Sequence, residues 1–422
     1  MLNVLGAIVA FAAVIFLIRK KFNFGASLIL GSIILGVFSL NEIEPIEIPK
    51  AMIEASFYSF KNQQFFTNTI ELAFLMLLIF ILAKCMQETG AIKRLIDSLR
   101  TIFSKGGALG VIPAVYGLMP IPGGALFSAP MVNEEGKKYN ITKDEKNFLN
   151  VWFRHIWFAI YPISSAMILI CSYSFSNINI YYLVLINIPA FIASIVIGLF
   201  YLKRFIKKSP EVDVCAKKDY GGLIFLLPPT LPILFYGFLQ LIEGFPQIRA
   251  FWIGVVFSII LLYFLLQTSL KQYLDIIKKS INVKLPLAIF GILIFREVFN
   301  VSGSTAIIAD LIGNLPFPTI IIIILIPLVF GILTGYNLGA VALSYPLVEP
   351  FFGYSGVGIV GITSIVFVSA LVGYLVSPIH LCNVLSSEHF KTDTTRMYRM
   401  YVPSAMFLLV IQTIFVIIVF PA

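Results

Sequence analysis

Two stretches of the sequence place proline and glycine inside apolar segments. Residues 117–132 read GLMPIPGGALFSAPMV, and residues 334–348 read TGYNLGAVALSYPLV. Proline removes a backbone donor and clashes with the preceding helical turn. Broken backbone is tolerated at membrane depth only where protein buries it or where it lines a wet cavity. We therefore predict two re-entrant hairpins, at about residues 106–135 and 316–348, whose free N–H groups can hold a small anion.

The tips of these two hairpins supply most of the predicted substrate-binding residues. They are Pro120, Pro122, Gly123, Gly124 and Ser128 in the first hairpin, and Thr334, Gly335, Asn337 and Gly339 in the second. Glycine lets a ligand approach the backbone closely. The alternative is tight helix packing with no ligand at the tips.

Two further breaks are predicted at Pro162 and Pro378, within helices at about residues 145–172 and 357–387. The flanking polar residues complete the predicted binding set: they are Ser164, Ser165, Ser377 and Asn383. Residues 377, 380 and 383 recur at helical spacing and would form one polar stripe. Such a stripe faces protein or water, so its alternative role is hydrogen bonding between helices.

Ionisable side chains within membrane spans are functional candidates by default. Arg154 and His155 precede Pro162, and we predict that they attract an anion or take part in ion coupling. The alternative for Arg154 is snorkelling to the membrane surface. His380 is predicted to carry a proton near neutral pH, or else to act as a neutral hydrogen-bonding group. Arg296 and Glu297 are predicted to pair structurally.

The overall composition defines the class of protein. The chain has 422 residues, of which 59% are hydrophobic and 12% charged, about half the charged fraction of a soluble domain. This predicts an all-α polytopic membrane protein. The net charge of +9 resides in short loops, which follows the positive-inside rule rather than indicating nucleic acid. The four cysteines are scattered, so neither a disulfide framework nor a metal site is expected.

The two halves of the sequence repeat one plan. Pro130 and Pro346 are separated by 346 − 130 = 216 positions, and Pro162 and Pro378 by the same 378 − 162 = 216. We predict two inverted repeats of about five transmembrane helices, each with a hairpin and a broken helix. The first spans residues 1–205, a cytoplasmic linker spans 206–218, and the second spans 219–422.

The distribution of lysine and arginine predicts the orientation in the membrane. Placing both termini outside puts most basic loops in the cytoplasm. No Walker A motif occurs, and the G-x-G-x-x-G match at residues 356–361 lacks an acidic ribose partner. No hydrolase motif is present either, so we expect no enzymatic activity.

The first hairpin also carries a family resemblance, through residues 119–130, MPIPGGALFSAP. The chain resembles the ion transporter superfamily of gluconate, lactate, citrate and C4-dicarboxylate permeases, and most of all the integral-membrane family called domain of unknown function 401. The resemblance implies a scaffold and a mobile transport domain, often in a homodimer, that move organic anions with H⁺ or Na⁺.

These observations favour a secondary active transporter in the cell membrane. Its substrate would be a small organic anion, a carboxylate, coupled to an H⁺ or Na⁺ gradient, with no cofactor beyond a bound Na⁺. The alternatives are an exporter or antiporter of an inorganic anion or metabolite, and a membrane enzyme or channel-like receptor.

Overall fold

The structure is a computed structural model that describes residues 2–103, 106–119, 123–206, 218–266, 268–313 and 316–421. Within these ranges the helices are joined by turns and loops, and the β-structure consists of one antiparallel pair of short strands, β1 (Tyr58–Ser59) and β2 (Gln64–Phe65), and an isolated bridge between Val357 and Pro421. Seven of the described helices are long and apolar enough to cross a membrane, or eight if a pair bent by 73° counts as one span. The prediction of an all-α polytopic membrane protein is confirmed.

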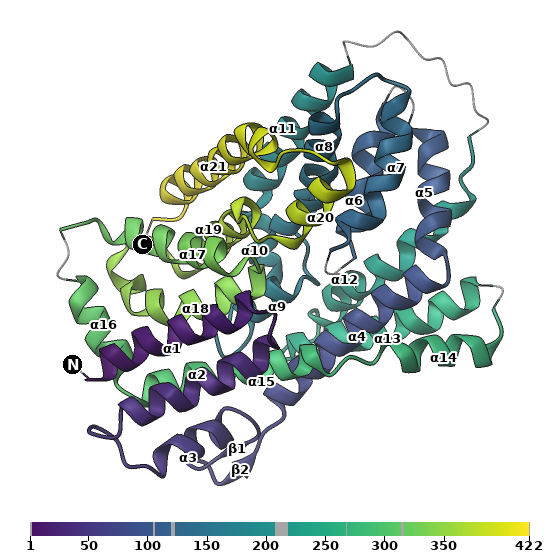
Figure 1. Ribbon diagram of the computed structural model, residues 1–422. Helices are drawn as coiled ribbons and strands as arrows, with labels where there is room; N and C mark the ends of the chain where they lie inside the picture. Colours follow the sequence, from purple (N-terminus) through teal and green to yellow (C-terminus); the bar gives the residue numbers. More distant parts are fainter. Residues whose placement is uncertain are drawn as a thin grey trace.

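One group of helices packs side by side in the lower part of Figure 1. Each helix in this group contacts the next in the following series: α1 (Leu2–Arg19), α2 (Phe24–Phe38), α15 (Lys284–Val301), α4 (Asn68–Glu88), α13 (Gln247–Leu265) and α12 (Leu227–Leu239). Glycine permits the crossing of α2 and α15, because a Cβ on Gly25 would overlap the Leu287 carbonyl. Small residues at crossings let membrane helices approach closely.

A second group contains two helical hairpins and two broken helices. The hairpins are α6 (Ala108–Gly117) with α7 (Ala125–Lys137), and α17 (Thr319–Thr334) with α18 (Asn337–Val348). The broken helices are α8 (Lys143–His155), η1 (Ile156–Ala159) and α9 (Ser165–Cys171) in one half, and α19 (Ile359–Val376) and α20 (Leu381–Phe390) in the other. Helix α7 contacts α8 and α20, while α18 contacts α19 and α9, so each hairpin packs on both broken helices (Figure 1).

The two breaks have the same local structure. Helix α8 begins at residue 143 and α19 begins at residue 359, which is 359 − 143 = 216 positions later. Residues 161–164 and 377–380 are both non-helical, with a Pro-Ile turn at the centre. Proline cannot donate within a helix, so the same break arises twice from the same chemistry. The opposite orientation of the two halves stays a prediction.

The remaining elements connect these groups. They are α3 (Glu47–Glu54), α5 (Ala91–Ile102), α10 (Ile180–Ile186), α11 (Ile188–Ile206), η2 (Gly221–Leu226), α14 (Leu270–Ser280), α16 (Ser304–Gly313), η3 (Glu349–Tyr354) and α21 (Thr394–Val419). Gly90 and Gly303 turn the chain into α5 and α16 with φ of 76° and 72°. The linker predicted at 206–218 lies almost wholly outside the described residues.

Candidate functional site

Both hairpin tips meet the second helix break. A Cβ on Gly123 would lie 2.8 Å from Leu385 Cδ1, and one on Gly335 would lie 2.7 Å from Ile379 Cγ1. Both glycines have positive φ, at 70° and 59°, a region that other residues rarely adopt. The segment 379–385 therefore contacts both hairpin tips.

Three helix N-termini lie at this junction. They belong to α7, α18 and α20, and in the described structure none has a side-chain cap, since the N-cap residues are Gly124, Tyr336 and His380. The first N–H groups of a helix have no partner within the helix, and the aligned peptide dipoles favour negative charge there. The arrangement suits an anion.

Arg154 is buried beside one of these N-termini, with only 2% of its surface exposed. Its Nη1 donates to the Tyr116 carbonyl at 2.7 Å. Gly124 leaves room for the guanidinium, because a Cβ there would lie 2.5 Å from Nη1. The snorkelling alternative is wrong, because the side chain points into the protein.

Two of the predicted coupling residues come together with a cysteine. His155, His380 and Cys382 are buried, and one potential ligand atom from each lies within 4.8 Å of the other two. The expectation of no metal site rested on spacing along the chain, and it overlooked this set because His155 is more than 220 residues from the others. The His380-x-Cys382 spacing was the only local signal.

Ser377 and Asn383 bridge the second break. Ser377 Oγ donates to the Ile332 carbonyl at 2.7 Å, which joins the break to α17. Asn383 Nδ2 donates to the Leu375 carbonyl at 2.9 Å. The predicted polar stripe is therefore not on one continuous helix. Among the described residues, Oδ1 of Asn383 and Oδ1 of Asn337 are buried without a hydrogen-bond partner.

Ser128 belongs to a hydrogen-bond network that joins three helices. Its Oγ donates to Asn150 Oδ1 at 2.6 Å, and Asn150 Nδ2 donates to Ser386 Oγ at 2.9 Å. Asn147 Nδ2 donates to Ser387 Oγ at 2.9 Å beside it. Sequence reasoning missed both asparagines, although amide side chains in a buried helix signal such partners. This network holds α7 and α20 against α8.

The other predicted residues have local contacts. Ser164 Oγ accepts from the Met167 N–H at 3.4 Å and caps α9, which begins at Ser165. Thr334 Oγ1 donates to the Phe330 carbonyl at 2.7 Å. A Cβ on Gly339 would lie 3.2 Å from the Phe24 ring. Pro120 and Pro122 lie outside the described residues.

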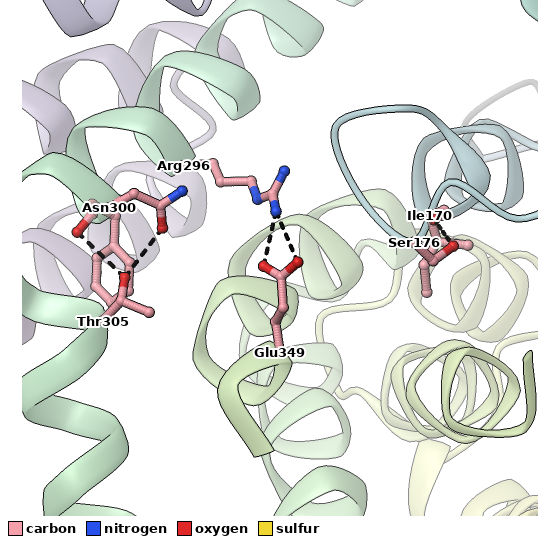
Figure 2. Close-up of polar contacts among 7 residues, drawn as sticks. Ile170, Ser176, Arg296, Asn300, Thr305 and Glu349 are labelled. Atoms are coloured by element: carbon pink, nitrogen blue, oxygen red, sulfur yellow. Dashed lines mark hydrogen bonds and ion pairs between the residues drawn. The ribbon is translucent and has the colours of Figure 1, made fainter. Parts of the chain in front are cut away.

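A charged cluster lies away from this junction, at α15. Arg296 pairs with Glu349 at 2.8 Å rather than with Glu297, its predicted partner (Figure 2). Its guanidinium also stacks over the Phe175 ring at 5.0 Å. A cavity of about 480 Å³ opens beside it, with Glu54 and Glu297 in its wall.

A family model matches the sequence, and two solved structures share the fold. The sequence model of a family described as "protein of unknown function (DUF401)" matches residues 1–421. A search of curated proteins found no match. The YdaH transporter of Alcanivorax borkumensis has a TM-score of 0.63 at 12% identity, covering 96% of this chain and 97% of that chain. MtrF of Neisseria gonorrhoeae, described with a class of antimetabolite efflux pumps, has a TM-score of 0.58 at 12% identity, covering 90% of this chain and 85% of that one.

Proposed function

The chain belongs to the DUF401 family of integral-membrane proteins, and from this premise we propose that it is a secondary active transporter of a small organic anion. The substrate class is a carboxylate, and transport proceeds by alternating access. The fold that the chain shares with YdaH and MtrF supports transport over catalysis. The proposal concerns a multi-pass protein of the cell membrane with both termini outside.

One observation carries the proposal: three uncapped helix N-termini meet at residues 379–385 beside the buried Arg154. Each N-terminus presents N–H donors and a partial positive charge equivalent to roughly half an elementary charge. A carboxylate has two acceptor oxygens and one negative charge, so it matches both the donors and the field. A neutral sugar or an organic cation would gain much less from this arrangement.

The coupling ion is proposed to bind at the same junction. Unwound backbone carbonyls and the C-terminal ends of half-helices hold Na⁺ in transporters with broken helices. Here the Oδ1 atoms of Asn337 and Asn383 add two buried acceptors without partners among the described residues. The alternative ion is H⁺, carried by His380. Both ions fit a substrate whose negative charge must be compensated during transit.

The two helix groups are proposed to move relative to each other during transport. The hairpins and broken helices, which hold the junction, would move against the group built on α2, α15 and α4. The cavity beside Arg296 lies between α15, the α3–α4 connection and Tyr173, and is the proposed outer entrance. A homodimer would fix the stationary group in the membrane.

Export is the second candidate. The MtrF structure is described with a class of antimetabolite efflux pumps, so the same fold operates outward in that protein. An exporter would use the same junction for the anion but exchange it against the inward ion gradient.

The experiment is a thermal stability screen of the purified protein in detergent. A panel of small carboxylates is added with and without Na⁺, and across pH. A ligand that binds the folded state raises stability by RT ln(1 + [L]/Kd), about 2.7 kcal/mol at 100 times Kd. Stabilisation by one carboxylate is expected, enhanced by Na⁺ or by lower pH. Stabilisation by organic cations or neutral solutes alone would contradict the proposal.

A further inference from the structure

The buried cluster of His155, His380 and Cys382 has the composition of a metal site. Their side chains come from the end of α8 and the start of α20, and one potential ligand atom from each lies within 4.8 Å of the other two. Their exposed fractions are 5%, 1% and 4%. We propose that these three side chains bind a Zn²⁺ ion at the junction of the two broken helices.

His155 is oriented as a metal ligand. Its Nδ1 lies 2.6 Å from the Val151 carbonyl, so this nitrogen carries the proton and donates it. The lone pair is then on Nε2, which lies 3.4 Å from the Tyr374 hydroxyl on the cluster side. Metal-binding histidines commonly donate their second nitrogen to a backbone carbonyl, which fixes the tautomer and ring orientation.

His380 supplies the independent sign of a missing ligand. Neither of its ring nitrogens has a nitrogen or oxygen partner at hydrogen-bond distance among the described residues, although the side chain is 1% exposed, and the polar group that faces the ring is the Cys382 thiol. Its ring lies 4.8 Å from that of His155, measured between centroids. A buried polar group without a partner costs about 1–3 kcal/mol, so an imidazole held here for packing alone would be expensive. A metal ion would use its lone pair.

The donor set selects the metal. One thiolate and two imidazoles suit zinc, whereas calcium and magnesium need oxygen ligands. Tetrahedral zinc with bonds of about 2.0–2.3 Å places its ligand atoms about 3.3–3.6 Å apart. The present limit of 4.8 Å therefore requires a closure of about 1.5 Å at most. Rotation of the side chains of His380 and Cys382 supplies such a movement.

The charge balance points to the fourth ligand. Zn²⁺ and one thiolate leave a net charge of +1, and Arg154, which interacts electrostatically with Cys382, adds another. Zinc sites with three protein ligands keep an open fourth position. An anion would fill that position and neutralise the charge. The identification of this anion as the transported carboxylate rests on the proposed function, whereas the metal site itself does not.

The test is Zn²⁺ binding to the purified full-length protein in detergent, after removal of any histidine tag and of bound metal by chelation. Zinc alone is added, and the amount retained after desalting is measured by mass spectrometry. We expect one equivalent per chain. Replacement of zinc by Co²⁺ should give a sulfur-to-cobalt charge-transfer band in the near ultraviolet, which reports the thiolate directly on the wild-type protein.

Variants separate a built site from adventitious binding. Cys382→Ser, which is nearly isosteric, should weaken zinc binding by about tenfold or more and remove the cobalt band. His380→Ala should weaken binding comparably. Cys171→Ser removes another buried thiol and should retain both signals. No zinc on the wild-type protein, equal binding by Cys382→Ser, or retention of Cu⁺ but not Zn²⁺ would overturn the assignment.

The outcomes also separate this inference from the proposed function. Zinc retention without stabilisation by any carboxylate would support the metal site and contradict the proposal that the protein transports an organic anion. Stabilisation by a carboxylate in zinc-free protein, with no zinc retention, would do the reverse.

Discussion

The two helix breaks share a backbone but differ in chemistry. Residues 161–164 read YPIS and residues 377–380 read SPIH, and each forms a Pro-Ile turn between two helices. In the first break the Ser164 hydroxyl caps the following helix. In the second, His380 occupies the same position without capping, between the rings of Tyr374 and His155.

The same Pro-Ile turn therefore has a different role in each half of the chain. Ser164 caps the helix after the first break, where Tyr161 Oη is buried without a hydrogen-bond partner among the described residues. Both hairpin tips meet the second break, where His380 and Asn383 carry such atoms. Duplicated halves thus supply similar geometry, and a few substitutions decide which half holds the chemistry.

The largest effect is expected from Gly335→Val, at the hairpin tip that contacts Ile379. The left-handed conformation costs a non-glycine residue about 1–3 kcal/mol, and the added carbons would displace the break. Uptake into proteoliposomes should fall to background. Gly353→Val is the matched control, since a Cβ there would meet nothing within 4 Å. Normal uptake by the Gly335 variant would show that this hairpin tip is not part of the binding site.

Removing the side chain at the equivalent position of each break, His380 or Ser164, should affect transport unequally. His380→Ala is expected to lower transport by about tenfold or more, equivalent to about 1.4 kcal/mol of lost interaction. Ser164→Ala should instead lower stability by about 1 kcal/mol through loss of the helix cap. Uptake assays and thermal denaturation of both variants test the contrast. Equal effects of the two variants on transport would show that the breaks are functionally alike.

Asn383 sharpens the same contrast, because the position 216 residues earlier is the apolar Met167. Asn383→Leu removes the amide that donates to the Leu375 carbonyl and leaves that acceptor without its partner, at a cost of about 1–3 kcal/mol. Tyr398→Phe removes a hydroxyl that accepts from Asn383 and donates to the Ser377 carbonyl at 2.7 Å. That carbonyl keeps a contact from Asn383 Nδ2 at 3.4 Å, so the loss should be about 1 kcal/mol. Melting temperatures in detergent provide the comparison, and a larger loss in the tyrosine variant would be inconsistent with it.

The smallest effect is expected at the ion pair that lies outside the junction. Arg296 and Glu349 are 16% and 38% exposed at their side chains, and the pair is shown in Figure 2. Partly exposed pairs contribute about 0–1 kcal/mol. Glu349→Gln should therefore lower the melting temperature only slightly, and less at high salt. A loss as large as that of the Asn383 variant would place this pair among the main structural supports.

The hairpins and breaks could be predicted from sequence because their cause is local. Pro162 and Pro378 lie at the two breaks, and the repeated spacing makes these breaks recognisable, whereas Pro130 and Pro346 lie within α7 and α18. The burial of Arg154 could not be predicted, because the same sequence is compatible with a buried side chain and with one that snorkels to the membrane surface. Cys382 and Asn150 were missed because one partner of each, His155 and Ser386, lies more than 220 residues away, and only the packing of α8 on α20 brings them together.

We propose that the junction at residues 379–385 binds an anion and moves it against its gradient. The most direct measurement is uptake, into proteoliposomes, of the carboxylate that most stabilises the wild-type protein, under an imposed Na⁺ or proton gradient. We expect the carboxylate to accumulate above its outside concentration. This accumulation should be lost when the gradient is collapsed and should be absent in Gly335→Val. Passive equilibration without accumulation, or equal accumulation by the variant, would contradict it.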